Sequence, residues 1–231
     1  MNYTWLGHGS IRLEIGDQVL LIDPWLDGNP SFPDDRRDAA CAGATAILLT
    51  HAHFDHLDGV ADLARELGLT VHAIIELAGY LSEAEGLETV GFNKGGTVRL
   101  GDVDVTMVGA VHSSSVPGPD GTSLYMGEPA GFMVTGEGRT VYVSGDTDVM
   151  ADMGVWNDLH APEIGILCAG GHFTMDMRGA AYAASKLFSL GTVIPVHYKT
   201  FPLLEQSADA LVAALPDVRV LTPEVMETVT L

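Results

Sequence analysis

The segment Thr50-His51-Ala52-His53-Phe54-Asp55-His56-Leu57-Asp58-Gly59 concentrates three imidazoles and one carboxylate within six residues. It follows an apolar run, 46–49, that indicates a buried strand, and it precedes a helical pattern over 57–67. Alternate residues at the end of a strand can point the same way, so His51 and His53 can bind the same metal ion. Asp55 and His56 can then face a second position beside it. Because imidazole and carboxylate groups bind zinc, manganese, nickel or iron, the segment predicts two adjacent metals rather than a chance cluster on a solvated turn.

Composition indicates one globular domain over residues 1–231. A chain of this length fits a single domain of ordinary size. Its hydrophobic content of 47%, with only 18% charged residues, supports a sizeable core and argues against disorder.

Strand and helix patterns alternate along the chain. Apolar or alternating runs predict strands over 3–15, 19–22, 46–49, 70–75, 97–111, 132–134, 140–143, 163–167 and 192–196. Helical patterns follow over 57–67, 76–85, 149–159, 176–190 and 207–215. Two stretches, 27–44 and 113–129, are rich in turn residues and predict long loops that border a substrate pocket. This order fits an α+β fold in which two sheets pack face to face and helices lie outside.

Three later stretches place further ligand-type residues at strand ends: Val111-His112-Ser113-Ser114, Ser144-Gly145-Asp146-Thr147-Asp148 and Pro195-Val196-His197-Tyr198. Together with the HxHxDH pattern of 51–56, they resemble the metallo-β-lactamase superfamily. The stretches 5–10, 127–132, 170–175 and 197–202 further resemble a small family of metal-dependent hydrolases related to the ascorbate phosphate lactonases. The resemblance runs from Tyr3 to about Phe201, and it implies a four-layer αββα sandwich with the metal site along one edge.

The resemblance also implies a ligand set. It assigns one metal to His51, His53 and His112, the second to Asp55, His56 and His197, and the bridging position to Asp146. We expect two divalent ions, with zinc first and manganese, nickel or iron as alternatives. A hydroxide shared by the two ions would be the nucleophile, so Asp55 and Asp146 are catalytic candidates.

Two residues near the start of the chain are expected to support this site. Asp23 ends a buried strand, where an unpaired carboxylate would be unfavourable, and in the family it holds the histidine motif from behind. His8 stands between glycines and is a catalytic candidate, either touching substrate or standing behind the metal ligands. His8, His172 and Tyr198 are the candidates for stabilising a leaving group.

Charge and hydropathy limit the partners and the compartment. The formal charge of −20, from 31 acidic and 11 basic residues, disfavours nucleic acid as a partner. No apolar run has the length of a membrane span and the first residues do not resemble a signal peptide, so we expect a cytoplasmic protein without membrane contact. Cys41 and Cys168 have no metal or redox spacing and are expected to be buried thiols. The expected partner is a small-molecule substrate, and homo-oligomerisation is left open.

Three functions compete. A hydrolase acting on a small ester, lactone or phosphodiester leads. A metal-dependent nuclease of the same superfamily is the second, and the charge disfavours it. The third is a redox or metal-binding protein without hydrolytic turnover, but the diiron redox relatives carry Glu where this chain has His53 and need a flavin domain that does not fit here.

Overall fold

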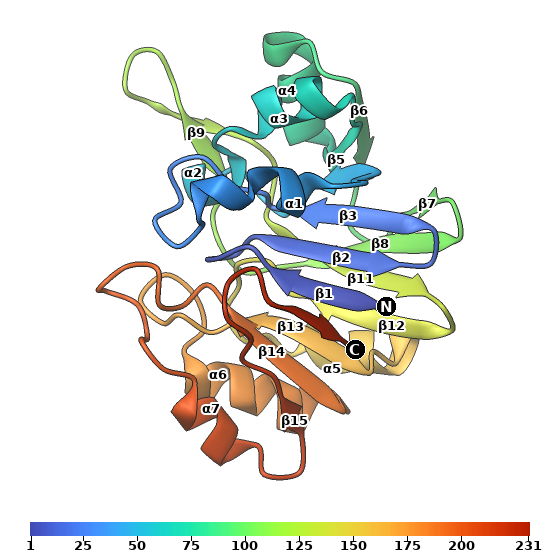
Figure 1. Ribbon diagram of the computed structural model, residues 1–231, viewed down its shortest axis with the longest axis vertical. Coiled ribbons are helices and arrows are strands. Elements are labelled where there is room, and N and C mark those ends of the chain that lie inside the picture. The colour runs from blue at the N-terminus through green and yellow to red at the C-terminus, as the bar shows by residue number, and fades with distance from the viewer.

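A computed structural model describes residues 1–231 and shows two seven-stranded sheets packed face to face. Figure 1 shows helices on the outer sides of this pair, so the expected four-layer αββα sandwich is confirmed. The two sheets repeat one plan, because each begins with antiparallel strands and continues with parallel ones.

The first sheet has the strand order β16-β1-β2-β3-β4-β5-β6. Its strands are β1 (Asn2–Trp5), β2 (Ile11–Ile15), β3 (Gln18–Ile22), β4 (Ala46–Leu48), β5 (Val71–Ile74), β6 (Thr89–Phe92) and β16 (Thr228–Thr230). In β2 the apolar side chains Ile11, Leu13 and Ile15 are buried and alternate with two charged ones, as the period of a strand requires. The sequence patterns did not indicate β6.

The second sheet has the order β15-β14-β13-β12-β11-β8-β7. Its strands are β7 (Thr97–Leu100), β8 (Val103–Gly109), β11 (Ala130–Gly136), β12 (Arg139–Val143), β13 (Ile164–Cys168), β14 (Thr192–Val196) and β15 (Arg219–Val220). The strands β13 and β14 are buried throughout, because they lie inside the sheet with structure on both faces.

The observed ends of the helices differ in part from those expected from the sequence. The helices are α1 (Arg37–Cys41), α2 (Phe54–Leu57), α3 (Val60–Leu67), α4 (Ile75–Glu85), α5 (Asp152–His160), α6 (Met177–Tyr182) and α7 (Asp209–Ala214), with a 3-10 turn at Asp34–Arg36 and a π-helical turn at Ala183–Leu187. The single helix expected over 57–67 is wrong: α2 starts earlier, and Gly59 at φ +78° in the left-handed region separates it from α3. The helix expected over 176–190 is α6 continued by the π-helical turn.

Both expected loops contain regular structure. Residues 27–44 include the 3-10 turn and α1, and residues 113–129 include a small hairpin of β9 (Ser115–Pro117) and β10 (Ser123–Tyr125). This hairpin projects from the body of the protein at the upper left of Figure 1. None of the helices combines the length and the hydropathy needed to cross a bilayer. Cys41 and Cys168 are unpaired and buried, as expected.

The carboxyl ends of the parallel strands meet at one edge of the sandwich. The connections that follow β3, β13 and β14 gather on the left in Figure 1, while the N-terminus lies on the right. Ligand sites of open parallel sheets form at such strand ends, because successive connections there converge on one crevice. The topology therefore brings 50–56, 146 and 197 to the same place.

The core between the sheets depends on large apolar side chains such as Phe132 of β11, which is fully buried and stacks on Phe92 of β6 at 6.2 Å between ring centroids. We expect Phe132→Ala to lower the free energy of unfolding by about 3–5 kcal/mol, because the cavity it leaves cannot collapse completely. Urea unfolding followed by circular dichroism measures this change. The same substitution at Phe173, which is 50% exposed, is the control and should change the free energy by less than about 0.5 kcal/mol.

Candidate metal centre

The first cluster of ligand atoms is formed by three imidazoles. His51 and His53 follow β4, and His112 follows β8 of the other sheet. The Nδ1 atom of His53 lies 3.0 Å from His51 Nε2 and 3.1 Å from His112 Nε2. A single N–H on His53 could satisfy only one of these two acceptors. Nitrogen ligands about 2.0–2.1 Å from a tetrahedral zinc are roughly 3.3 Å apart, so this spacing suits a shared ion better than a hydrogen-bonded triplet.

Asp23 and Thr50 fix the tautomer of His51. Thr50 donates its backbone N–H to Asp23 Oδ1 at 2.8 Å and its hydroxyl to Asp23 Oδ2 at 2.6 Å. Since the Thr50 hydroxyl hydrogen is used, His51 Nδ1–H donates to the Thr50 oxygen at 3.0 Å. The lone pair of His51 is therefore on Nε2, which faces the cluster.

Asp23 fixes His56 in the same way. His56 Nδ1 lies 2.9 Å from Asp23 Oδ2 and donates to it, so in the neutral, metal-binding form of His56 the lone pair is on Nε2. That Nε2 atom is buried and has no hydrogen-bond partner. The expected role of Asp23 behind the motif agrees with these contacts, whereas Thr50 was not singled out in the sequence although it directly precedes the motif.

The second cluster combines Asp55 and His56 of α2 with His197 after β14 and His8 after β1. Their ligand atoms lie within 4.8 Å of one another. His197 Nε2 is 3.6 Å from Asp55 Oδ2 and has no hydrogen-bond partner. The short helix α2 is the reason that Asp55 and His56 reach this cluster while His53, just before the helix, reaches the first.

Asp146, after β12, lies between the two clusters. Its Oδ2 atom is 3.0 Å from His197 Nε2, 3.4 Å from His56 Nε2, 3.6 Å from His112 Nε2 and 3.9 Å from His51 Nε2. The contact with His197 is close but not aligned as a hydrogen bond. One carboxylate thus touches both predicted ligand groups, which is the arrangement that a bridging ligand needs.

The electrostatics of the cluster favour cations. Burial opposes ionisation of Asp146, but His197 and His56 beside it hold the pKa of its carboxyl well below the usual range. Burial also lowers the pKa of His197, yet Asp146 and Asp55 more than offset this and raise it to about 9. Protons on the imidazoles therefore balance the buried carboxylates, and divalent ions would displace those protons.

Left-handed backbone conformations and closely packed glycines occur around the ligand clusters. Asp23, His8 and His197 have φ values of +48°, +52° and +60°, which residues with side chains rarely adopt and which concentrate at functional sites. A Cβ on Gly170 would lie only 1.9 Å from the carbonyl oxygen of His197, and one on Gly9 would lie 2.8 Å from the ring of His56. Only glycine leaves room for the two histidines.

The ligand clusters open into a cavity of about 610 Å³. It is lined by His53, Phe54, Asp55, His112, Ser113, Asp146, Phe173, His197, Phe201, Pro202 and Leu203. This volume suits a small molecule. The apolar members of the lining had not been identified from the sequence, because they come from three segments that are far apart in the chain.

His8 occupies a different position from a substrate contact. Its side chain is 0% exposed and does not line the cavity, which favours a position behind the metal ligands over contact with substrate. Burial lowers the pKa of His8 to about 4, and the neutral ring donates from Nε2 to Asp55 Oδ2 at 2.8 Å. Its Nδ1 lies 3.0 Å from the hydroxyl of Thr200. His8 therefore contacts Asp55 from the side away from the cavity.

The two other leaving-group candidates, His172 and Tyr198, lie outside the cavity lining. His172 is exposed and lines a separate cavity with residues 203–207, while its neighbour Phe173 faces the ligand clusters. Tyr198 is buried, and its ring stacks on Trp5 at 5.2 Å between centroids. Neither side chain lines the cavity beside the metal ligands.

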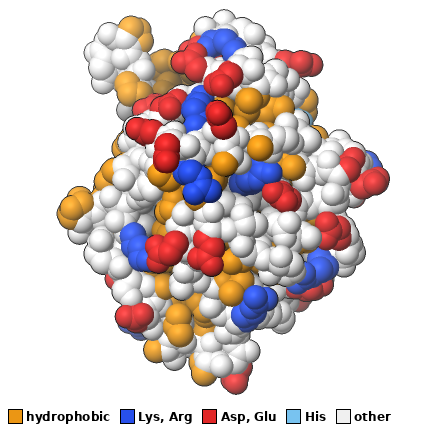
Figure 2. Space-filling model, in the orientation of Figure 1, with side chains coloured by type: hydrophobic (Ala, Val, Ile, Leu, Met, Phe, Trp, Pro, Cys, Tyr) orange, Lys and Arg blue, Asp and Glu red, His pale blue; other side chains and the backbone are white.

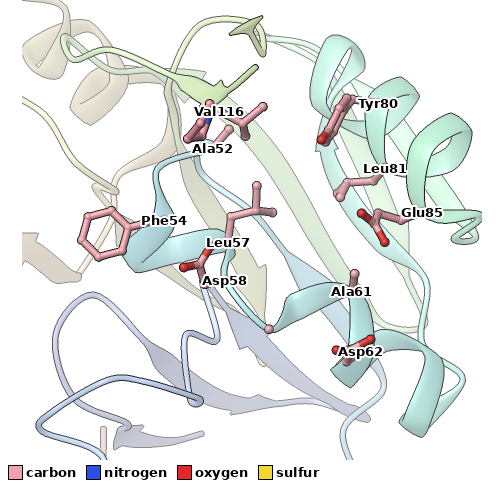
Figure 3. A pocket seen from close by; sticks show the side chains of 12 residues that line it. Ala52, Phe54, Leu57, Asp58, Ala61, Asp62, Tyr80, Leu81, Glu85 and Val116 are labelled. Carbon is pink, nitrogen blue, oxygen red and sulfur yellow. The ribbon is translucent and has the colours of Figure 1, made fainter. Parts of the chain in front are cut away.

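A second cavity, of about 410 Å³, lies on the other side of α2. Figure 3 shows Tyr80, Leu81 and Glu85 of α4 facing the segment of Leu57 and Asp62 across it. None of the predicted metal-ligand side chains lines it. Its carboxylates Asp62 and Glu85 pair with Arg65 at 2.7 and 2.6 Å. The chemistry of the site therefore belongs to the 610 Å³ cavity.

Comparison with known proteins agrees with this geometry. The family model described as beta-lactamase superfamily domain matches residues 18–198. The chain is 67% identical to a UPF0173 metal-dependent hydrolase of Dinoroseobacter shibae over 100% of both chains, and 58% identical to one of Ruegeria pomeroyi over 99% of both. Among solved structures it is similar to Igni18, a metallo hydrolase of Ignicoccus hospitalis, with a TM-score of 0.87, 30% identity and coverage of 100% of this chain and 97% of that one.

The bonds around Asp23 predict its effect on metal binding. In Asp23→Asn, one oxygen becomes an NH₂ group, which cannot accept a hydrogen bond. The side chain can then no longer accept from Thr50 and His56 together, so the two imidazoles lose their fixed tautomers. We expect metal affinity to fall about 10–100-fold, as for other residues that hold metal ligands. Competition titration with a fluorescent chelator measures the affinity. Asp58→Asn, just beyond α2, is the control, and equal affinity losses in both variants would contradict the assigned role of Asp23.

Proposed function

The chain belongs to the metallo-β-lactamase superfamily and is a metal-dependent hydrolase, and we propose that it cleaves a small ester, lactone or phosphodiester at a centre of two divalent metal ions. The observation that carries this proposal is the position of Asp146 Oδ2, within 3.0–3.9 Å of imidazole nitrogens from both ligand clusters.

The residues present fit two ions. Each cluster offers at least three donors, His51, His53 and His112 in one and Asp55, His56 and His197 in the other. His56 and His197 keep buried Nε2 atoms without partners, and such atoms are unfavourable unless a cation or proton satisfies them. Imidazole and carboxylate donors suit zinc first, with manganese, nickel and iron as alternatives.

When bound, such ions supply a water acidified to a pKa of about 7 and polarise the carbonyl or phosphoryl oxygen of the substrate. The protein contributes the positions of the ligands. Asp146 supplies the negative charge that lets two cations lie close together, and Asp55 is held in place by the N–H of His8. The apolar part of the cavity excludes water from the substrate and strengthens the electrostatic interactions beside it.

The surface charge favours a small substrate over a nucleic acid. On the face shown in Figure 2, Lys and Arg side chains lie singly among Asp and Glu side chains and form no continuous basic patch. The formal charge of −20 adds long-range repulsion of polyanions. The nuclease alternative is disfavoured for this reason. The redox alternative is disfavoured by His53, which stands where diiron redox relatives have Glu.

Asp146→Asn tests the proposal most sharply among single substitutions. The amide cannot balance two cations, so we expect the metal content to fall by at least one ion per chain and kcat/KM to fall at least about 1,000-fold on an ester found by screening. Elemental analysis and an initial-rate assay on matched preparations measure the two effects. The circular dichroism spectrum should stay unchanged, because Asp146 lies at a strand end.

The control is Asp148→Asn, which changes an exposed carboxylate two residues away. It should keep the metal content and the activity of the wild type. An Asp146→Asn protein with full metal content and near wild-type turnover would show that the reaction does not use a shared carboxylate.

A further inference from the structure

The cavity beside the metal ligands has two chemically different sides. One side consists of metal-ligand side chains and Ser113. The other, here called the apolar wall, consists of Phe54, Phe173, Phe201, Pro202 and Leu203. No Lys, Arg, Asn or Gln side chain lines the cavity, so a charged or hydroxyl-rich group placed against the apolar wall would meet no polar side chain.

Two members of the apolar wall, Phe54 and Phe201, pack against aromatic rings behind them. Trp25 is buried behind the wall, and its ring lies 5.7 Å from that of Phe54 in an edge contact and 6.2 Å from that of Phe201. Phe201 also contacts the ring of His8 at 5.3 Å. Because these aromatic groups pack on one another, binding an apolar group against Phe54 and Phe201 would require little ordering of those two side chains.

Three members of the wall remain open to solvent. Phe54 is 57% exposed, Phe173 is 50% exposed and Leu203 is 65% exposed. Large apolar side chains that gather around a cavity with convergent polar groups on its other side are typical of a binding site. A group that covers this wall would gain the free energy of removing its apolar surface from water.

We propose that the substrate is a neutral molecule that carries an aryl or bulky alkyl group next to its scissile bond, with that group against the apolar wall. This inference rests on the proposed hydrolase function and narrows its substrate class. It favours uncharged esters and lactones over phosphodiesters and sugar phosphates. The metal ions would hold the reacting carbonyl, while the wall would select what is attached to it.

A pair of metal-binding probes tests the proposal without requiring turnover. Benzohydroxamate and acetohydroxamate offer the same chelating group and differ in the phenyl ring. For the metal-loaded protein, we expect isothermal titration calorimetry to show at least about tenfold tighter binding of benzohydroxamate. We expect 4-carboxybenzohydroxamate to bind more weakly than benzohydroxamate, because its carboxylate would face the wall without a partner.

Substitutions in the wall separate its effect from the intrinsic affinity of each probe for metal. In Phe173→Ser/Leu203→Ser, the preference for the phenyl group should fall to about threefold or less, with metal content unchanged. The exchanged pair Phe173→Leu/Leu203→Phe keeps an apolar wall and should keep most of the preference. Val155→Ser, at a position on α5 that is 56% exposed, is the control and should leave the preference as in the wild type.

Equal affinity for the two neutral probes, tighter binding of the carboxylated probe, or a preference that survives Phe173→Ser/Leu203→Ser would overturn the substrate class. A changed oligomeric state in that variant, with the preference intact, would identify the wall as a protein interface instead. Binding of neither probe would contradict the accessible metal centre itself, whereas a retained preference without turnover of any ester would contradict only the hydrolase proposal.

Discussion

The burial of the Asp146 carboxylate among imidazoles from both sheets is the interaction on which the rest of the site depends. A buried carboxylate without partners is strongly unfavourable, so its place at the end of β12 requires positive charge around it. His51 and His56 come from the first sheet and His112 and His197 from the second, and all four rings approach the same oxygen. The predicted metal ligands therefore also connect the two halves of the sandwich.

Two backbone hydrogen bonds also connect the two halves of the sandwich at this site. The N–H of His197 donates to the carbonyl oxygen of His8 at 2.8 Å, and the N–H of Ala130 donates to that of Thr50 at 3.0 Å. The left-handed conformations of His8 and His197 are maintained by these contacts, since the residues would otherwise relax to ordinary φ values. The favourable free energy of packing the two sheets offsets the backbone strain at the edge where His8 and His197 lie.

Much of this arrangement could be predicted from the sequence, because it depends on local patterns. The HxHxDH segment follows a strand, and His112, Asp146 and His197 each follow another, so the topology alone brings them to one edge. The grouping of His51 with His53 and of Asp55 with His56 follows from where α2 begins. The ligand roles themselves remain predictions.

The remaining features depend on packing between distant segments, which no local pattern encodes. His8 was expected near the site, but its burial behind Asp55 depends on packing against the tilted ring of His197, at 3.9 Å between ring centroids. The choice between His172 and Phe173 for the cavity depends on the left-handed turn at His172. Tyr198 follows a metal ligand in sequence, yet it packs on Trp5 away from the cavity.

Anomalous X-ray diffraction from crystals of the metal-loaded protein, recorded at the absorption edge of the metal, tests the central claim most directly. Our account predicts two peaks about 3.5–4 Å apart, one beside His51, His53 and His112 and the other beside Asp55, His56 and His197, both within coordination distance of Asp146. A single peak at full metal loading, or two peaks of which only one contacts Asp146, would contradict it.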